Sequence, residues 1–179
     1  MKELSLHILD IAENSTGAGA DFIRIAVDET FKDRYISIEI QDNGSGIRQE
    51  MIGSVTDPFV TTRKTRRTGL GISLFKAAAE QSGGSFEIES DGKTGTVLKA
   101  AFEKNHIDTA PVGDMAATIT TLIAGNPGVD IRYEHTVSDG LFHLDTREIR
   151  QDLDGIDITH PAVLEKIRGL INDNIEAKR

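Results

Sequence analysis

The most constraining feature of this sequence is an alternating run that stops at a glycine-rich turn. Residues 35–41 read Tyr-Ile-Ser-Ile-Glu-Ile-Gln and are followed by Asp42-Asn-Gly-Ser-Gly-Ile47. Alternation of apolar and polar residues is typical of a strand with one face in the core. The sequence therefore predicts a half-buried strand from which the Asp42 carboxylate emerges at the point where the strand ends.

The chemistry of this strand end depends on what an ionised carboxylate can do. A carboxylate only accepts hydrogen bonds, so in a pocket Asp42 would favour a base edge with an amino group, as in adenine, over one with a carbonyl. Gly44 and Gly46 have no Cβ, so the backbone there could lie against a flat ring. Taken alone, the string Asp-Asn-Gly-Ser-Gly predicts only a turn, as most such strings do. Its interpretation depends on the segments before and after it.

Composition narrows the class of protein. The chain has 179 residues, which suffices for one core plus a small appended module. Its net charge of −9 argues against binding along a nucleic-acid backbone. The sequence contains no cysteine and no apolar run that approaches a membrane span. We therefore expect a cytoplasmic protein without disulfides, without nucleic acid and without a membrane partner.

Two polar side chains stand out on the first predicted helix. The apolar residues in 4–12 are spaced for a buried helix that ends near Gly17. Asp10 and Asn14 lie four positions apart and so project from one helix face. The Asn14 amide oxygen suits a hard cation that keeps most of its waters, and Asp10 could orient or deprotonate a water beside that cation. The alternative is an ordinary helix face in contact with solvent, where Asp and Asn four positions apart are common.

A basic segment and two glycines precede another predicted helix. Residues 63–67 contain four cations in five positions, and residues 68–71, Thr-Gly-Leu-Gly, lead into a helix over 73–81. The first amides of a helix are unpaired and lie at the positive end of its dipole, which favours phosphate. The cations could close over a terminal phosphate from a flexible loop. The alternative to a phosphate site is a basic loop that aids solubility, followed by a glycine that serves as the N-cap of the helix.

The order of elements predicts the fold class. Alternating runs at 22–27, 85–90 and 96–102 read as further strands, and residues 49–55 read as a short helix. The order is helix, two strands, helix, loop, helix, two strands. This order predicts a two-layer α/β sandwich in which helices cover one face of the sheet.

Four of these segments together resemble the GHKL ATPase superfamily, which includes sensor histidine kinases, gyrase, mismatch-repair ATPases and anti-sigma kinases. They are Asp10-Ile-Ala-Glu-Asn14, Asp42-Asn-Gly-Ser-Gly46, Pro58-Phe-Val-Thr-Thr-Arg63 leading to Gly69-Leu-Gly-Ile72, and Thr94-Gly-Thr96. The resemblance covers about residues 1–103 and implies the α+β Bergerat fold with a mixed sheet. Residues 10–21 are similar to the mismatch-repair type, whereas residues 58–89 resemble the second half of a histidine-kinase catalytic domain.

The resemblance also implies a site for ATP and Mg²⁺. Asn14 would be the Mg²⁺ ligand that bridges the phosphates, Asp42 would read adenine, and Thr96 would reach adenine through a water. The other binding residues that it implies are Gly44, Gly46, Ile47, Arg63, Lys64, Thr68, Gly69, Leu70 and Gly71. The family usually has Glu as the water-activating residue, and here that position is Asp10. The shorter side chain leaves open whether ATP is hydrolysed, because positioning supplies much of the catalysis.

Two functions are compatible with these residues. The first is an ATP-dependent protein kinase or ATPase in signal transduction that acts on a separate partner. The few residues before Asn14 leave no room for the helical hairpin that carries a phosphoacceptor histidine, so we expect the acceptor on another protein. The second is a non-catalytic switch in which ATP controls binding to a partner protein. In either case the chain could form a homodimer.

Residues 110–179 predict a small α+β module after an ATP-binding domain over 1–104. The module would contain a helix over 115–123, a hairpin formed by 129–137 and 141–144, and a last helix that starts at Pro161. It shows no recognisable catalytic constellation. A module of this size is too small to hold a large core alone, so we expect it to dock on the ATP-binding domain or on a partner.

Overall fold

A computed structural model of the protein describes residues 2–57, 70–138 and 140–176. In chain order the elements are α1 (Leu4–Gly17), β1 (Phe22–Asp28), η1 (Phe31–Asp33), β2 (Tyr35–Asp42), α2 (Gln49–Val55), α3 (Gly71–Gln81), β3 (Ser85–Ser90), β4 (Thr96–Glu103), α4 (Met115–Gly125), β5 (Asp130–Val137), β6 (Gly140–Asp145), α5 (Thr146–Asp152) and α6 (Pro161–Glu176). The short 3₁₀ turn η1 was not expected from the sequence.

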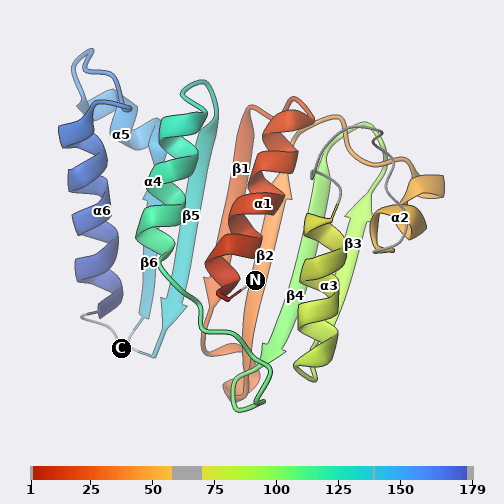
Figure 1. Cartoon of the computed structure of the whole chain (residues 1–179). Helices are drawn as coiled ribbons and strands as arrows, with labels where there is room; N and C mark the ends of the chain where they lie inside the picture. The colour runs from red at the N-terminus through yellow and green to blue at the C-terminus, as the bar shows by residue number, and fades with distance from the viewer. Residues whose placement is uncertain (1, 58–69, 139, 177–179) are drawn as a thin grey trace.

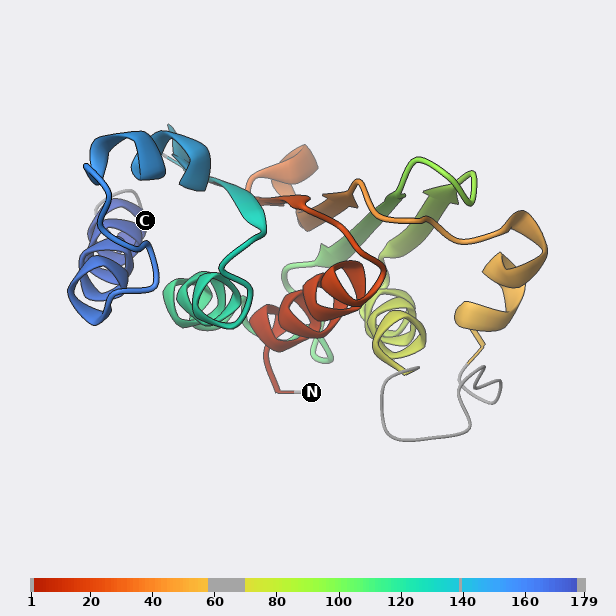
Figure 2. The same ribbon diagram turned by 90° about the horizontal axis from the view of Figure 1, so that it is seen from above.

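The six strands form one mixed sheet in the order β3-β4-β2-β1-β5-β6. β5 lies parallel to β1, whereas the other neighbouring strands are antiparallel. α1, α3, α4 and α6 line up across one face of the sheet (Figure 1), and the view from above shows the two layers (Figure 2). The predicted fold class is therefore confirmed: an α+β two-layer sandwich, with a mixed sheet covered on one face by helices.

Residue alternation decides which side of each strand enters the core. In β2, Ile36, Ile38 and Ile40 are buried under the helices, while Glu39 projects from the opposite face. On that opposite face the Arg24 guanidinium forms ion pairs with both Glu39 and Glu134. Charge pairs of this kind between neighbouring strands stabilise a sheet face that stays in contact with water.

The C-terminal segment continues the same sheet and the same core. β5 pairs with the whole length of β1. The connection to α4 is held on α1, where the Leu4 N–H donates to the Pro111 carbonyl at 2.9 Å. Met115 and Ile119 of α4 are buried in one hydrophobic cluster with residues of α1 and β1. The segment thus docks by extending the sheet, and its division from residues 1–104 as a separate domain stays a prediction.

Side-chain caps fix where two helices of this segment begin. The Asp114 carboxylate accepts a hydrogen bond from the Ala117 N–H at 2.7 Å, at the start of α4. The Asp145 carboxylate accepts from the Arg147 N–H at 3.0 Å, at the start of α5. Both aspartates satisfy amides that have no partner inside the helix. The cap at Asp114 explains why α4 begins at Met115, where the sequence predicts a helix.

Neither a membrane helix nor a metal cluster is found in the described ranges. Across residues 2–57, 70–138 and 140–176, no helix combines the length and the apolar character needed to cross a membrane. In the same ranges, no three His, Cys, Asp or Glu side chains are placed to hold a metal ion together. The cytoplasmic location stays a prediction from the sequence.

Candidate functional site

Asp42 ends β2 with a buried carboxylate that two protein groups hold. Its Oδ2 accepts a hydrogen bond from the Ser15 hydroxyl of α1 at 2.7 Å. Its Oδ1 accepts from the Gly44 N–H at 2.9 Å, within the turn that follows the strand. Only 9% of Asp42 is exposed. The carboxylate predicted at this strand end is therefore fixed between the end of α1 and the glycine turn.

The glycine turn packs tightly against the hairpin between β3 and β4. Gly46 has φ +69°, and a Cβ there would lie 2.9 Å from Ser90 Oγ and 3.0 Å from the Gly95 carbonyl oxygen. The next residue, Ile47, donates its N–H to Ser90 Oγ at 2.7 Å. A side chain at position 46 would have no room, and the conformation there favours glycine. The turn is thus held against the hairpin by its backbone.

Thr96 lies beside Asp42 on the neighbouring strand. The two residues are partners in the register of β2 and β4, and Thr96 is 6% exposed. Its hydroxyl donates to Ser90 Oγ at 3.3 Å, and Ser90 in turn donates to the Gly95 carbonyl at 2.6 Å. Ser90 therefore joins the glycine turn, Thr96 and the end of the hairpin in one hydrogen-bonded group.

A second group forms where the start of α3 meets α1. A Cβ on Gly71, the first residue of α3, would lie 3.3 Å from Asn14 Nδ2 and 3.4 Å from Asp10 Cβ. Among the described residues, the side chains of Asp10 and Asn14 make no hydrogen bond or ion pair. Within the part of the chain that the structure describes, no side chain caps the N-terminus of α3. The first turn of α3, where a helix has amides without partners inside the helix, therefore lies close to Asp10 and Asn14 of α1.

Burial affects two titratable groups on α1. Partial burial raises the pKa of the Asp10 carboxyl above its ordinary value. His7, one turn before Asp10, is 2% exposed, and burial lowers its pKa from 6.5 to about 4. The His7 ring packs 5.6 Å from the Phe75 ring of α3, and its Nδ1 atom has no hydrogen-bond partner among the residues that the structure describes. His7 is therefore a neutral packing residue between the two helices.

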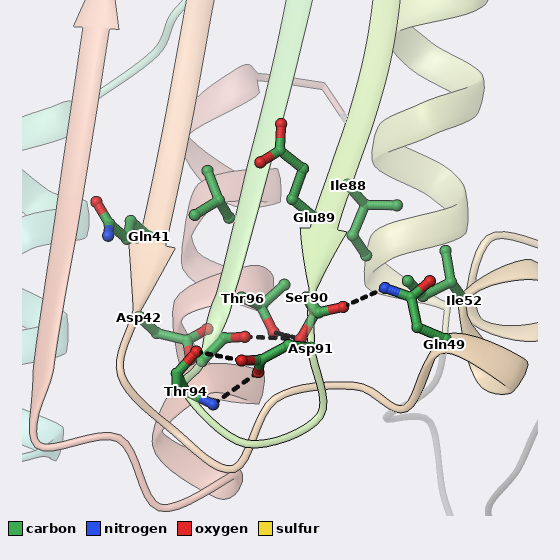
Figure 3. A pocket seen from close by; sticks show the side chains of 12 residues that line it. Gln41, Asp42, Gln49, Ile52, Ile88, Glu89, Ser90, Asp91, Thr94 and Thr96 are labelled. Carbon is green, nitrogen blue, oxygen red and sulfur yellow. Dashed lines mark hydrogen bonds between the residues drawn. The ribbon is translucent and has the colours of Figure 1, made fainter.

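A cavity of about 570 Å³ lies at the ends of the strands near Asp42 (Figure 3). The residues that line it come from β2, α2, the β3–β4 hairpin and β4: Gln41, Asp42, Gln49, Ile52, Ile88, Glu89, Ser90, Asp91, Thr94, Gly95, Thr96 and Val97. α2 is fixed beside it by a hydrogen bond of 2.7 Å from the Gln49 side-chain amide to the Ser90 carbonyl. Asp42 and Thr96 are thus part of a hollow that is open to solvent.

Comparison with known proteins shows which protein family has this arrangement of helices and strands. The model of the family "Histidine kinase-, DNA gyrase B-, and HSP90-like ATPase" matches residues 1–106. The chain belongs to this family. The predicted superfamily is thereby confirmed, and the structure is that of a histidine-kinase-like ATPase domain with a C-terminal extension of its sheet.

Relatives of this ATPase domain include sensor kinases. The chain is 30% identical over 103 residues to the "Putative sensor histidine kinase NtrY-like" of Rickettsia typhi, which covers 58% of this chain and 17% of that protein. It is 36% identical over 89 residues to "Sporulation kinase D" of Bacillus subtilis, with 50% of this chain and 17% of that protein covered. The chain thus spans less than a fifth of the length of these relatives.

Solved structures share the fold at low sequence identity. The "Aquifex aeolicus MutL ATPase domain complexed with ADP" superposes with a TM-score of 0.51 at 15% identity, covering 75% of this chain and 60% of that one. The "N terminal domain of a DNA repair protein" superposes with a TM-score of 0.55 at 17% identity, covering 81% and 52%. At these identities the likeness concerns the fold alone.

The predicted site residues of the ATPase domain fall into three sets. Asp42, Gly44, Gly46, Ile47 and Thr96 come together around the glycine turn and the β3–β4 hairpin. Asp10, Asn14 and Gly71 meet between α1 and α3, next to Leu70, which is 36% exposed. Arg63, Lys64, Thr68 and Gly69 lie outside the described residues.

Sequence reasoning missed two serines that hold the first set together. Ser15 follows Asn14 directly and lies one helical turn after Ile11, so the apolar periodicity of α1 could have placed it on the buried side. Ser90 ends β3 and gave no signal, because its partners Ile47 and Gly95 are set by the meeting of the turn and the hairpin.

Proposed function

We propose that this chain binds Mg²⁺–ATP and transfers its terminal phosphoryl group, either to a separate partner protein in signal transduction or to water. One observation carries the proposal. Successive residues of α1 contact both groups of the site: Ser15 binds the Asp42 carboxylate, and Asn14 lies against Gly71 at the start of α3. A ligand that spans the two groups would have its base at Asp42 and its phosphates at Asn14.

The residues present fit such a ligand. Mg²⁺ in nucleotide sites keeps several waters and takes few protein ligands besides the phosphates, so the Asn14 amide oxygen alone is a sufficient donor. The start of α3, which no described side chain caps, supplies backbone amides at the positive end of a helix dipole. Gly71 lets a phosphate approach these amides closely. When bound, the cation would neutralise the phosphate charge. This chemistry supports the Asn14, Leu70 and Gly71 assignments.

The roles of the remaining residues follow from their chemistry. Asp42, which can only accept, would bind the amino group of adenine, with Gly44, Gly46 and Ile47 beside the ring and Thr96 reached through a water. Asp10 would orient or deprotonate a water, and its raised pKa makes it a better base than an ordinary aspartate. Arg63, Lys64, Thr68 and Gly69 would add contacts to the phosphates from the segment before α3.

The second candidate is a switch in which ATP changes the affinity for a partner protein without turnover. The Asp10 side chain favours this candidate, because it is one methylene shorter than the Glu expected at that place. A displaced water would lower phosphoryl transfer to water strongly while leaving ATP binding intact. Kinship with sensor kinases favours the first candidate.

Incubation with γ-labelled ATP and Mg²⁺, alone and with cell lysate, separates the two candidates. Label on a second protein or in free phosphate would support phosphoryl transfer, and Asp10→Asn should then abolish phosphate release while ATP still binds. Tight binding with no transfer of label would support the switch. If calorimetry detects no ATP binding with Mg²⁺ present, both candidates are wrong.

A further inference from the structure

Ser15 makes the shortest hydrogen bond to the strand-end carboxylate. Its Oγ lies 2.7 Å from Asp42 Oδ2, and the residue is 4% exposed. Oγ also lies 3.3 Å from the carbonyl oxygen of Ile11, one helical turn earlier. A hydroxyl has a single proton, and a charged acceptor at the shorter distance takes it. Ser15 therefore donates to Asp42.

The hydrogen bonds to Asp42 fix its orientation as well as its place. Ser15 holds one carboxylate oxygen from α1, and the Gly44 N–H holds the other from the turn at 2.9 Å. Rotation of the carboxylate about its Cβ–Cγ bond would break both contacts. Each oxygen keeps a further acceptor position, so a ligand can still be bound. The carboxylate is thus available to a ligand in one orientation only.

We propose that Ser15 is a positioning residue that makes the site select purines with a 6-amino group over purines with a 6-carbonyl group. The inference rests on the proposed nucleotide function and deepens it. A carboxylate that turns freely can accept from the N1–H of a 6-oxopurine as well as from a 6-amino group, so it discriminates poorly. A carboxylate held at both oxygens cannot turn, and a 6-carbonyl opposite it leaves two acceptors facing each other.

The test compares Mg²⁺–ATP with Mg²⁺–ITP, whose bases differ by an amino or a carbonyl group at position 6. We expect the unchanged chain to bind ATP at least about tenfold more tightly than ITP, because a polar site that meets the wrong group leaves it unpaired. In Ser15→Ala this ratio of Kd values should fall at least about fivefold, through weaker ATP and stronger ITP binding. Ser15→Thr keeps the hydroxyl and should keep the ratio.

Ser82→Ala is the matched control. Ser82 is fully buried, and its hydroxyl donates to the Ala79 carbonyl at 2.9 Å, so the variant removes a buried serine hydroxyl away from Asp42. A general loss of stability would lower both affinities together and leave their ratio unchanged. The proposal is overturned if Ser15→Ala keeps the ratio of the unchanged chain, or if Ser82→Ala lowers it equally.

Two further outcomes are decisive. Alanine favours a helix more than serine does, so Ser15→Ala should fold. Should it not, Ser15→Cys decides instead, because the thiol fills nearly the same volume but is a weak donor. A lower ratio in that variant supports the proposal, and an unchanged ratio overturns it. If the unchanged chain binds neither nucleotide, the proposed function itself is wrong. If it binds ATP and ITP equally well, the inference about Ser15 is wrong while the proposed function stands.

Discussion

Asp42 is the residue whose substitution most directly tests the base-binding group. Both of its oxygens accept from protein donors, so an amide in its place must turn its NH₂ group toward the Ser15 hydroxyl or the Gly44 N–H. Turned toward Ser15, the NH₂ group can donate to the hydroxyl, which then donates to the Ile11 carbonyl, 3.3 Å away. The substitution would still replace a carboxylate acceptor with a donor that faces the adenine amino group. We expect ATP affinity to fall by more than about tenfold by calorimetry.

Asp33→Asn is the control for this variant. Asp33 is an exposed residue of η1 with φ +59°, a conformation that asparagine adopts as readily as aspartate. The same change of charge there should leave ATP affinity within about twofold, since exposed charges away from a site contribute little. Equal affinities for the Asp42→Asn and unchanged chains would contradict the assignment of Asp42.

His7 makes the stability of the protein depend on pH. Its pKa is lowered by burial from 6.5 to about 4, so below pH 6.5 the unfolded chain takes up a proton that the folded chain does not. The free energy of unfolding should therefore fall as the pH drops from 6.5 to 4, by about 3 kcal/mol from this residue. The loss should level off below the folded pKa.

His7→Leu isolates this contribution from that of the carboxylates, which also titrate in acid. The variant has no proton to take up, so its stability should fall less steeply than that of the unchanged chain between pH 6.5 and 4. Urea unfolding at pH 7 and at pH 4.5 measures the difference. Identical pH slopes for the two chains would show that His7 is protonated without cost in the folded state.

At the scale of elements, Ser90 joins the glycine turn to the β3–β4 hairpin. It accepts from the Ile47 N–H and donates to the Gly95 carbonyl. Ser90→Ala removes both bonds and the bond that Ser90 accepts from the Thr96 hydroxyl, and it takes this donor from the buried Gly95 carbonyl. We therefore expect a loss of about 1–3 kcal/mol in the free energy of unfolding. Amide hydrogen exchange should become faster at Ile47 in particular. Ser85→Ala, at the other end of β3, should not change exchange at Ile47.

The individual elements could be predicted from the sequence because each carries its own local signal. Period-two alternation predicted β2, and the glycines with the apolar spacing predicted α3. The contacts of the site between elements could not be predicted in this way. The Ser15–Asp42 bond joins residues 27 positions apart, and only the packing of α1 over β2 creates it. The resemblance of motifs predicted that Asp42 and Thr96 belong to one site, but it did not predict which serines form hydrogen bonds with them.

For the whole molecule, the least predictable feature is the place of the C-terminal segment. A hairpin over 129–144 was visible in the sequence, but nothing local indicates that β5 would pair in parallel with β1. Parallel pairing between distant strands depends on long-range packing and carries no turn signal. Its consequence is that β1 has a partner on both sides and is an interior strand of a six-stranded sheet.

The last prediction follows from this interior position of β1. Removing residues 110–179 would turn β1 into an edge strand and would expose the side of α1 that packs on α4. Buried Ile119, Leu122 and Tyr133 would be lost from the shared core. We expect a chain of residues 1–109 to melt more than about 10 °C below the full chain in a thermal scan, or to aggregate. If instead the two chains melt within a few degrees and bind ATP equally, residues 1–104 form an independent domain and the extension serves another purpose.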